Sequence, residues 1–485
     1  MITFLICLGL LAGSYFTYGR YLERLCDVDA SHPVPSQTRY DGVDYMPLPR
    51  WKIFLIQLLN IAGLGPIFGA VLGAAYGPVA FLWITLGGIF IGGMHDLISG
   101  IMSVRYGGQS LPEVVGALLG NRVKLILRIV SILLLILVGT VFLSQPAMLI
   151  AVKIHALEPV SFVSFPRLLL IVLGVILAYY MLATLLPVDK IIGRFYPLFG
   201  VALVAMALGL LGAVVAGPWR IPELTTLSNF QLRAAELPIV PTLFITVACG
   251  AISGFHATQS PLMARCVGDE RACRPVFYGA MISESIIALV WAAVAMAFFG
   301  GAGELSTALS AHGDSAAWAV GEISHGMLGL VGGALALLGV VAAPVTSGDT
   351  AFRSARLIVA DMLRLDQRSK LRRLAVSLPL LAAGYLLTRV DFGVVWRYFA
   401  WTNQTLAVVV LWAIVVYLVQ RGAPVRVALW PALFMTFVCA SFVFVSDQFL
   451  GMECRPAAYA LGGAATLAVW LLFRSKIRRD AKGNA

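Results

Sequence analysis

A few ionisable side chains lie inside long apolar stretches of this 485-residue chain, where they are the first candidates for chemistry. Asp96 follows His95, Glu284 lies about half way along a later apolar stretch, and His256 lies in a glycine-rich segment between them. A charged side chain at mid-membrane costs roughly 2.5–3.5 kcal/mol, so each needs a partner, a water-filled cavity or neutralisation. Groups held in this way can take up and release protons. The pattern therefore predicts proton coupling at His95, Asp96 or Glu284, whereas His256 is a candidate for substrate binding.

Each of these residues also has a structural interpretation. His95 and Asp96 form either a proton relay or a fixed hydrogen-bonded pair that anchors two helices. Glu284 has no basic neighbour in the sequence, which favours proton carriage or a buried hydrogen bond to another helix. Asp349 comes four residues before Arg353, so an ion pair at the membrane edge competes with a role in coupling. The sequence alone leaves both interpretations open.

Neutral polar side chains in other apolar stretches offer oxygen and amide groups. Thr346 and Ser347 follow Pro344, where their hydroxyls either bind a cation, with Na⁺ as an alternative to H⁺, or satisfy carbonyls that the proline frees. Asn403 and Gln404 place two amides within one apolar run. Such amides commonly hydrogen-bond between helices, and direct contact with a substrate is the alternative.

Two apolar stretches are interrupted by glycine, proline and polar residues. A break of this kind releases backbone groups that must be buried in protein or line a cavity. Five expected helices separate the start of one break from the start of the other. The candidate substrate-binding residues are Asn60, Gly63, Gly65 and Pro66 in the first break and Ser253, Gly254, His256, Gln259 and Ser260 in the second.

The positions of the two breaks predict an architecture. Many secondary transporters consist of two inverted repeats, each with a discontinuous helix, and their substrate lies between the two breaks. Half-helix N-termini there attract an anion, and unwound carbonyls hold a cation. Close helix packing is the alternative explanation for any one glycine, but two breaks in corresponding positions favour a transporter.

The elements that must position these residues are membrane-spanning helices. Of all residues, 60% are hydrophobic and only 12% are charged, and the apolar residues come in blocks long enough to span a bilayer. We therefore expect an all-α membrane protein with about thirteen transmembrane helices. The expected spans are 2–19, 51–74, 78–103, 123–152, 166–186, 190–216, 238–258, 273–299, 326–346, 374–389, 395–419, 427–446 and 456–473.

These spans divide the chain into four parts. We expect an N-terminal helix and loop in 1–50, a first five-helix repeat in 51–216, a second in 217–419, and two further helices with a basic tail in 420–485. No polar stretch is long enough for a soluble core, so a sensor would lack an output domain. An intramembrane hydrolase is also disfavoured, because no HExxH or GxSxG motif occurs.

The distribution of charge predicts the orientation. The net charge is +11, and most of the 35 Lys and Arg residues lie in short segments between apolar blocks, which indicates the positive-inside rule and not a nucleic-acid partner. We expect the N-terminus and the loop near 300–325 outside, and the basic run 353–373 and the C-terminal tail in the cytoplasm. The seven cysteines show neither a disulfide framework nor zinc-ligand spacing, so no metal or cofactor is expected.

Several motifs resemble those of the carbon starvation protein A family. They are DGVDYMPLPRW, IAGLGP, LPVDKIIGRFYP, CGAISGFHATQSPLMARC, YGAMISESIIALVWAA, APVTSGDTAFRSARLIVADML and WRYFAWTNQTLA, and they occur in family order between about residues 40 and 410. The chain is much shorter than the best-known members, and the resemblance is weak after about residue 420.

This resemblance implies a bacterial inner-membrane protein with a LeuT-like core, related to the amino acid-polyamine-organocation transporters. Family members are associated with uptake during carbon starvation, some of peptides and others of pyruvate in symport with protons. The family's unwound segments fall on the two breaks described above. Its ninth-helix motif falls on Thr346, Ser347 and Asp349, and Asp96 and Glu284 match its acidic positions.

The sequence and the resemblance together predict a proton-coupled secondary transporter. Pyruvate is the first expected substrate, because a carboxylate fits half-helix N-termini and hydroxyls, and no basic residue lies deep in the spans. A short peptide is the alternative, with Glu284 or Asp96 as the acceptor of its amino group.

Overall fold

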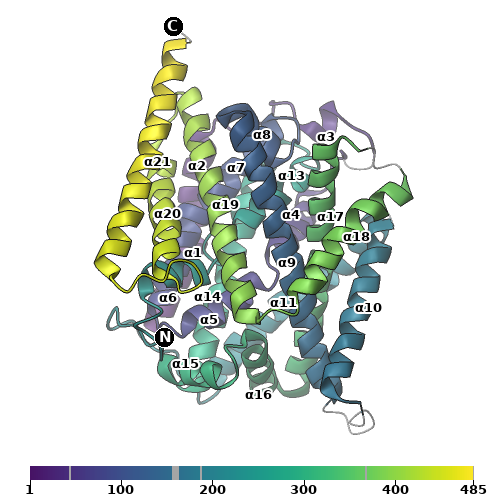
Figure 1. Cartoon of the computed structure of the whole chain (residues 1–485), viewed down its shortest axis with the longest axis vertical. Helices are drawn as coiled ribbons and strands as arrows, with labels where there is room; N and C mark the ends of the chain where they lie inside the picture. The colour runs from purple at the N-terminus through teal and green to yellow at the C-terminus, as the bar shows by residue number, and fades with distance from the viewer. Residues whose placement is uncertain (43–44, 156–162, 186–187, 366–368, 484–485) are drawn as a thin grey trace.

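Straight, bent and interrupted helices make up the computed structural model of the chain (Figure 1). The structure describes residues 1–42, 45–155, 163–185, 188–365 and 369–483. The first half contains α1 (Ile2–Phe16), α2 (Tyr18–Leu25), α3 (Pro35–Thr38), α4 (Arg50–Ile61), η1 (Gly65–Gly69), α5 (Ala70–Ala74), α6 (Val79–Leu82), η2 (Trp83–Gly92), α7 (Gly93–Arg105), α8 (Leu111–Leu119), α9 (Asn121–His155), α10 (Phe165–Leu185) and α11 (Val188–Ala216). The second half contains η4 (Ile239–Leu243), α12 (Phe244–Thr246), α13 (Gly254–Ala264), η5 (Glu270–Ala272), η6 (Arg274–Tyr278), α14 (Gly279–Phe299), α15 (Ala302–Ala311), α16 (Ala316–Ala336), η7 (Leu337–Ala342), α17 (Ala343–Leu363), α18 (Lys370–Leu387), α19 (Phe392–Gln420), α20 (Arg426–Val445) and α21 (Arg455–Gly483).

The described part of the chain contains ten helices that are long and apolar enough to cross a membrane, or eleven if the bent pair 50–61 and 65–74 is one span. An all-α membrane protein is therefore confirmed. The expected total of about thirteen is larger, and it stays a prediction. The difference arises because the segment 239–264 is split into short helices, and because α17 and α18 contain several charged residues.

The most deeply buried spans form the centre of the bundle. Burial reaches 83% in both Val79–Arg105 and Phe392–Gln420 and 78% in Glu270–Phe299, whereas Arg455–Ser475 is only 11% buried and Ile2–Leu25 only 28%. Figure 1 shows α21 along one edge of the bundle. Peripheral first and last helices are what we expect if they lie outside two repeats, although the repeat boundaries themselves stay a prediction.

Both expected breaks are present, and the second is shorter than expected. Helix α4 ends at Ile61, and the chain resumes as η1 at Gly65 with a bend of 56°. In the second break, α12 ends at Thr246 and α13 begins at Gly254. The expectation that Gln259 and Ser260 belong to this break was wrong, because Ser253 in an extended conformation starts a helix that continues through Pro261.

The expected ninth span, 326–346, was also wrong in its limits. Helix α16 begins at Ala316, inside the expected outer loop, and α17 continues to Leu363, inside the expected basic loop 353–373. Gly329 interrupts α16 with φ 58° and ψ −140°. Charged residues of α17 are buried in the bundle, with Asp349 and Arg356 only 3% and 5% exposed. Because these residues are charged, the hydropathy of the sequence predicted a loop in this segment.

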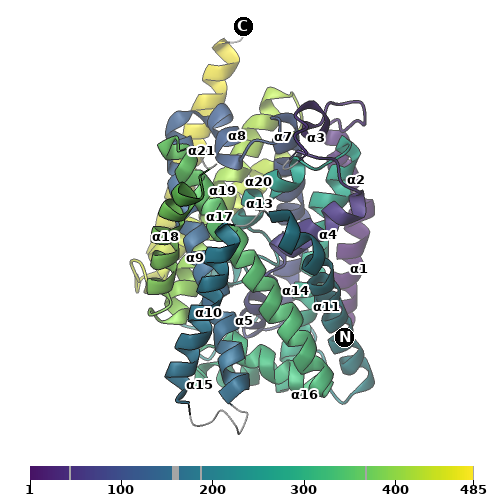
Figure 2. The same ribbon diagram turned by 90° about the vertical axis from the view of Figure 1, so that its right-hand side faces the viewer.

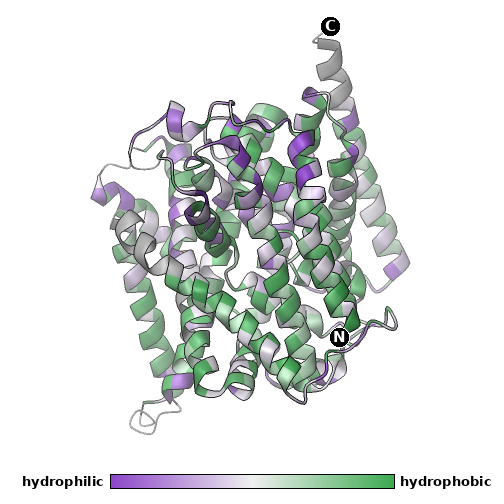
Figure 3. Ribbon diagram, turned by 180° about the vertical axis from the view of Figure 1, so that it is seen from behind, coloured by the Kyte–Doolittle hydropathy of each residue, from purple (hydrophilic) through white to green (hydrophobic). Residues whose placement is uncertain are grey.

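The two ends of the bundle differ in polarity and in the elements that lie there. The N-terminus, α15 and α16 lie at one end, and the C-terminus lies at the other (Figures 1 and 2). We call these the N-terminal end and the C-terminal end. Hydrophobic residues dominate the middle, and hydrophilic residues gather mainly at the C-terminal end (Figure 3).

Candidate functional site

The first break packs against two other elements through its glycines. A Cβ atom on Gly63 would lie 2.6 Å from Cζ of Phe142 in α9. A Cβ atom on Gly65 would overlap the side chain of Cys249, which belongs to the second break. Pro66 follows within η1, and Asn60 lies 4% exposed in the last turn of α4. The structure therefore brings the two breaks into direct contact.

The second break is held by Asn403 of α19. The Asn403 Oδ1 atom accepts a hydrogen bond from the Phe255 backbone N–H at 2.7 Å, and its side chain lies 3.1 Å from Ser253 Oγ. A Cβ atom on Gly254 would lie 2.6 Å from the backbone nitrogen of Ala407, so α13 and α19 touch at this glycine. Asn403 is thus the cap of α13 in this conformation.

Gln404, the neighbouring amide, holds the other side of the same break. Its Nε2 atom donates to the carbonyl oxygens of Phe244 at 3.3 Å and Ala248 at 3.2 Å. These carbonyls lie in α12 and just beyond its end, where helical partners are missing. The pair of amides predicted from the sequence therefore satisfies the backbone that the break releases.

A buried chain of ionisable groups lies beside the breaks. His256 Nδ1 is 2.8 Å from Asp96 Oδ2, and His256 Nε2 is 3.2 Å from Glu284 Oε2. His95 Nδ1 is 2.7 Å from the other oxygen of Asp96, Oδ1. All four side chains are 0% exposed. The sequence singled out all four residues, and the structure joins them across α7, α13 and α14.

The geometry of this chain shows how its members are bound. The contact between His256 and Asp96 is a hydrogen bond, whereas the contact with Glu284 has ion-pair distance without hydrogen-bond alignment. Cys249 Sγ, a nitrogen of His256 and an oxygen of Glu284 lie within 4.8 Å of one another. His256 thus lies between the carboxylates of Asp96 and Glu284.

The remaining residues of α13 have different surroundings. Ser260 Oγ donates to the His256 carbonyl at 3.0 Å, which is a bond within its own helix. Gln259 is 0% exposed, its Nε2 lies 3.0 Å from Thr258 Oγ1, and its Oε1 has no hydrogen-bond partner among the described residues. Gln259 therefore fits a binding role better than Ser260 does.

The ninth-helix motif lies early in α17 and away from the ionisable chain. Asp349 Oδ2 is 3.4 Å from Arg353 Nη2, and Arg353 also donates to the Ala183 carbonyl at 2.8 Å. The predicted ion pair of Asp349 is therefore present. Thr346 is half-buried and Ser347 is 1% exposed in the preceding turn. Their proposed contact with carbonyls of the first break stays a prediction.

Phe142 connects this motif to both breaks, although nothing in the sequence distinguishes it from other apolar residues. Its ring lies against Gly63 of the first break and 6.4 Å from the ring of Phe255. A Cβ atom on Gly348 would lie 3.2 Å from Cβ of Phe142. One phenylalanine in an apolar span carries no signal, because the contact depends on three helices that are distant in sequence.

Comparisons with known proteins agree with this arrangement. The family model described as carbon starvation protein CstA matches residues 1–175 and 153–327. The chain is 41% identical over 358 residues to a membrane protein of Haemophilus influenzae, covering 64% of this chain and 95% of that protein. Among solved structures, it is similar to MhsT, a LeuT-fold transporter crystallised with L-phenylalanine, with a TM-score of 0.53, 15% identity and coverage of 88% of this chain and 98% of that chain.

Relatives whose names describe a transport function are less similar to this chain in sequence. The chain is 29% identical over 336 residues to the peptide transporter CstA of Helicobacter pylori, covering 57% of this chain and 48% of that protein. It is 28% identical over 331 residues to the pyruvate/proton symporter BtsT of Escherichia coli, covering 57% of this chain and 46% of that protein. The chain thus matches about half the length of these transporters. With its LeuT-like fold and its family match over residues 1–327, it is a multi-pass membrane protein that belongs to the carbon starvation protein CstA family.

Proposed function

We propose that this protein is a proton-coupled secondary transporter that imports a small organic carboxylate, with pyruvate as the substrate. The observation that supports it most is the buried chain from Asp96 through His256 to Glu284 beside the two breaks. A second candidate is the import of short peptides, because several relatives are named peptide transporters.

The buried chain has the composition that proton coupling requires. A histidine between two carboxylates is stabilised in its charged form by both, and it loses that stabilisation when either contact opens. His256 lies on α13, directly after the second break, whereas Asp96 lies on α7 and Glu284 on α14. Any movement of α13 relative to these helices therefore changes how many protons the group binds.

The contacts of the acidic residues favour a carboxylate over a peptide. A peptide needs a carboxylate to accept its amino group. Asp96 is already hydrogen-bonded to His95 and His256, which leaves Glu284, 3.2 Å from His256, as the acceptor inside the buried chain. Asp349 faces Arg353. An organic anion needs donors instead, and half-helix ends at broken helices supply them. The proposed substrate position is between Gly63–Pro66 and Ser253–Gly254.

The proposed orientation places the N-terminal end outside and the C-terminal end in the cytoplasm of a bacterial inner membrane. It is supported by the hydrophilic residues at the C-terminal end and by the basic residues there. Proton coupling is proposed over Na⁺ because the buried chain lies beside the breaks, whereas Thr346 and Ser347 lie on α17.

Uptake into proteoliposomes tests the proposal. Labelled pyruvate should accumulate when the outside is made acidic, and a protonophore should abolish this accumulation. Pyruvate uptake that follows an imposed Na⁺ gradient and ignores the pH gradient would contradict proton coupling. Accumulation of labelled dialanine without accumulation of pyruvate would establish the peptide alternative.

A further inference from the structure

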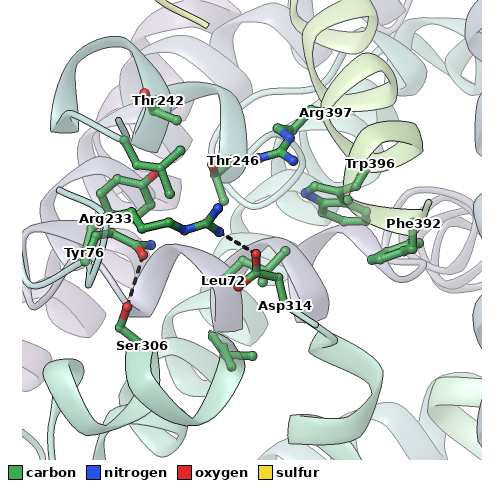
Figure 4. A pocket seen from close by; sticks show the side chains of 14 residues that line it. Leu72, Tyr76, Arg233, Thr242, Thr246, Ser306, Asp314, Phe392, Trp396 and Arg397 are labelled. Carbon is green, nitrogen blue, oxygen red and sulfur yellow. Dashed lines mark hydrogen bonds and ion pairs between the residues drawn. The ribbon is translucent and has the colours of Figure 1, made fainter. Parts of the chain in front are cut away.

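A pocket lined by polar and aromatic residues opens at the N-terminal end of the bundle, apart from the buried ionisable chain (Figure 4). Its volume is about 80 Å³, and its lining comes from α5, the segment before η4, the η4–α12 region, α15 and the first turns of α19. Its lining includes Arg233, Thr246, Asp314, Trp396 and Arg397.

The floor of this pocket adjoins both breaks. Thr246 is the last residue of α12, immediately before the second break. A Cβ atom on Gly69 would lie 3.7 Å from Cζ2 of Trp396, and the rings of Trp396 and Phe68 are 6.5 Å apart. Gly69 and Phe68 belong to η1, directly after the first break. The pocket is therefore the space just outside the proposed substrate position.

Two consecutive residues of α19 present unused hydrogen-bond donors to this pocket. Trp396 is 4% exposed, and its Nε1 atom has no hydrogen-bond partner in the described chain. Arg397 is half-buried, its Nε atom is buried without a partner, and no described residue forms an ion pair with it. Figure 4 shows the Trp396 indole nitrogen on the side of its ring that faces the pocket and Arg397.

Buried donors without partners are costly, so their presence indicates a ligand. An unsatisfied buried polar group costs about 1–3 kcal/mol, and more if it is charged. The nearest acidic residue in the pocket, Asp314, is already bound by Arg233 at 2.6 Å. Glu236 lies 3.9 Å from the same arginine, so Arg233 has two acidic partners, whereas Arg397 has no ion-pair partner among the described residues. A small anion with two oxygens can accept from both unpartnered donors and pair with the guanidinium of Arg397.

We propose that this pocket is an outer binding site for a small carboxylate, held by the guanidinium of Arg397 and the indole N–H of Trp396. The inference rests on the proposed function, because it gives the transported anion its first position on the way to the breaks. The ion pair between Arg233 and Asp314 lies across the pocket and neutralises the second arginine. A carboxylate bound at Arg397 therefore does not compete with Asp314 for the same arginine.

Chemical protection of Arg397 tests the site without transport. Phenylglyoxal modifies arginine side chains, and mass spectrometry of the purified full chain locates the modified residues. Pyruvate should slow modification of Arg397 severalfold, while pyruvamide, which lacks the charge, should not. Arg389 is exposed and lies near the start of the same helix, so it is the internal control. Equal modification of Arg397 with and without pyruvate would overturn the proposal.

Variants test the same site by uptake kinetics. Arg397→Gln should raise the KM for pyruvate about tenfold, which corresponds to about 1.4 kcal/mol, and change the maximal rate much less. Trp396→Phe keeps the aromatic packing, removes the N–H, and should raise the KM by a smaller factor. Arg397→Lys keeps the charge and should restore part of the affinity. Arg389→Gln is the matched control and should leave the KM unchanged.

The two experiments separate this inference from the proposed function. Protection of Arg397 without any pyruvate uptake by the wild-type protein would retain the outer site and contradict pyruvate transport. Uptake with an unchanged KM in Arg397→Gln and no protection would retain transport and contradict the outer site. If Arg397→Gln fails to fold, as judged by gel filtration, the protection experiment on the wild-type protein still tests whether the outer site exists.

Discussion

Gly65 packs directly against Cys249, so the first break and the second break touch at one glycine and one cysteine. A Cβ atom at position 65 would lie 2.5 Å from Cβ of Cys249, which neither backbone can easily accommodate. Gly65→Ala should therefore force the breaks apart, at a cost of about 1–3 kcal/mol, and reduce transport at least tenfold.

A double substitution distinguishes this contact from a general loss of folding. Adding Cys249→Gly to Gly65→Ala removes the obstructing side chain and should restore much of the uptake. Gly9→Ala is the matched control, because a Cβ atom there would have no neighbour within 4 Å. Normal uptake by Gly65→Ala alone would mean that the breaks need not touch.

A second prediction concerns the cap of α13. Asn403→Ala would leave the Phe255 N–H and the Ser253 hydroxyl without their partner in a buried place, at a cost of about 1–3 kcal/mol. We expect a lower melting temperature in detergent and strongly reduced uptake. Thr466→Val is the control, because Thr466 Oγ1 donates to the Gly462 carbonyl within its own helix. Equal melting temperatures for the two variants would exclude the cap as a stabilising contact.

A third prediction concerns coupling. Glu284→Gln keeps the size of the side chain and removes its titration, so pyruvate accumulation driven by a pH gradient should disappear while exchange of pyruvate persists. Asp96→Asn should act in the same way, because both groups face His256. Glu304→Gln, at an exposed site in α15, is the control. Accumulation with unaltered pH dependence in Glu284→Gln would remove this residue from the mechanism and leave Asp96 to be tested.

A fourth prediction concerns stability and pH at the C-terminal end. Burial alone would raise the pKa of Glu113, but hydrogen bonds from Lys124 and from Arg128 at 2.6 Å outweigh it and hold the pKa below its ordinary value of 4.5. Because the folded pKa is lowered, this contribution is fully present above pH 4.5 and is lost as the pH falls through the folded value. Glu113→Gln should lower the melting temperature by about 1–3 °C at pH 7.

The pH dependence of that difference is the diagnostic measurement. Melting curves of wild-type protein and Glu113→Gln should converge below pH 4.5, where the carboxylate of the wild-type protein begins to lose its charge. If the difference in melting temperature stayed constant as the pH fell to and below the folded pKa of Glu113, the ion pairs of Glu113 would contribute nothing to stability.

The fifth prediction concerns topology. Cys454 is exposed, whereas the other six cysteines are buried. It lies just before α21, where Arg455 donates to the Ala235 carbonyl at the N-terminal end. A membrane-impermeant maleimide should therefore label intact cells, and Cys454→Ser should abolish the labelling. Labelling only in inverted vesicles would reverse the proposed orientation.

The sequence predicted the breaks well because their cause is local. Glycine and proline act on their own backbone, so Gly65 and Pro66 mark the first interruption directly. The ion pair of Asp349 with Arg353 could be predicted for the same reason, because four residues make one helical turn. The pairing of His95 with Asp96 likewise joins neighbours in the chain.

The rest depends on contacts between distant segments. His256 meets Asp96 and Glu284 only after three helices have packed, so the sequence could nominate these residues but could not connect them. The limits of the ninth span were wrong because hydropathy counts Arg356 as solvent-exposed, although the bundle buries it. Trp396 and Arg397 gave no signal in the sequence, because an unused donor is visible only when its surroundings are known.

Helix α19 carries both the outer pocket and the cap of the second break. Arg397 and Asn403 are six residues apart on one continuous helix, a rise of about 9 Å. A hydrogen-bonded helix resists stretching, so these two residues move together as parts of one lever. If a carboxylate bound at Arg397 displaces this end of α19, Asn403 and its hydrogen bond to the Phe255 N–H of α13 would be displaced with it.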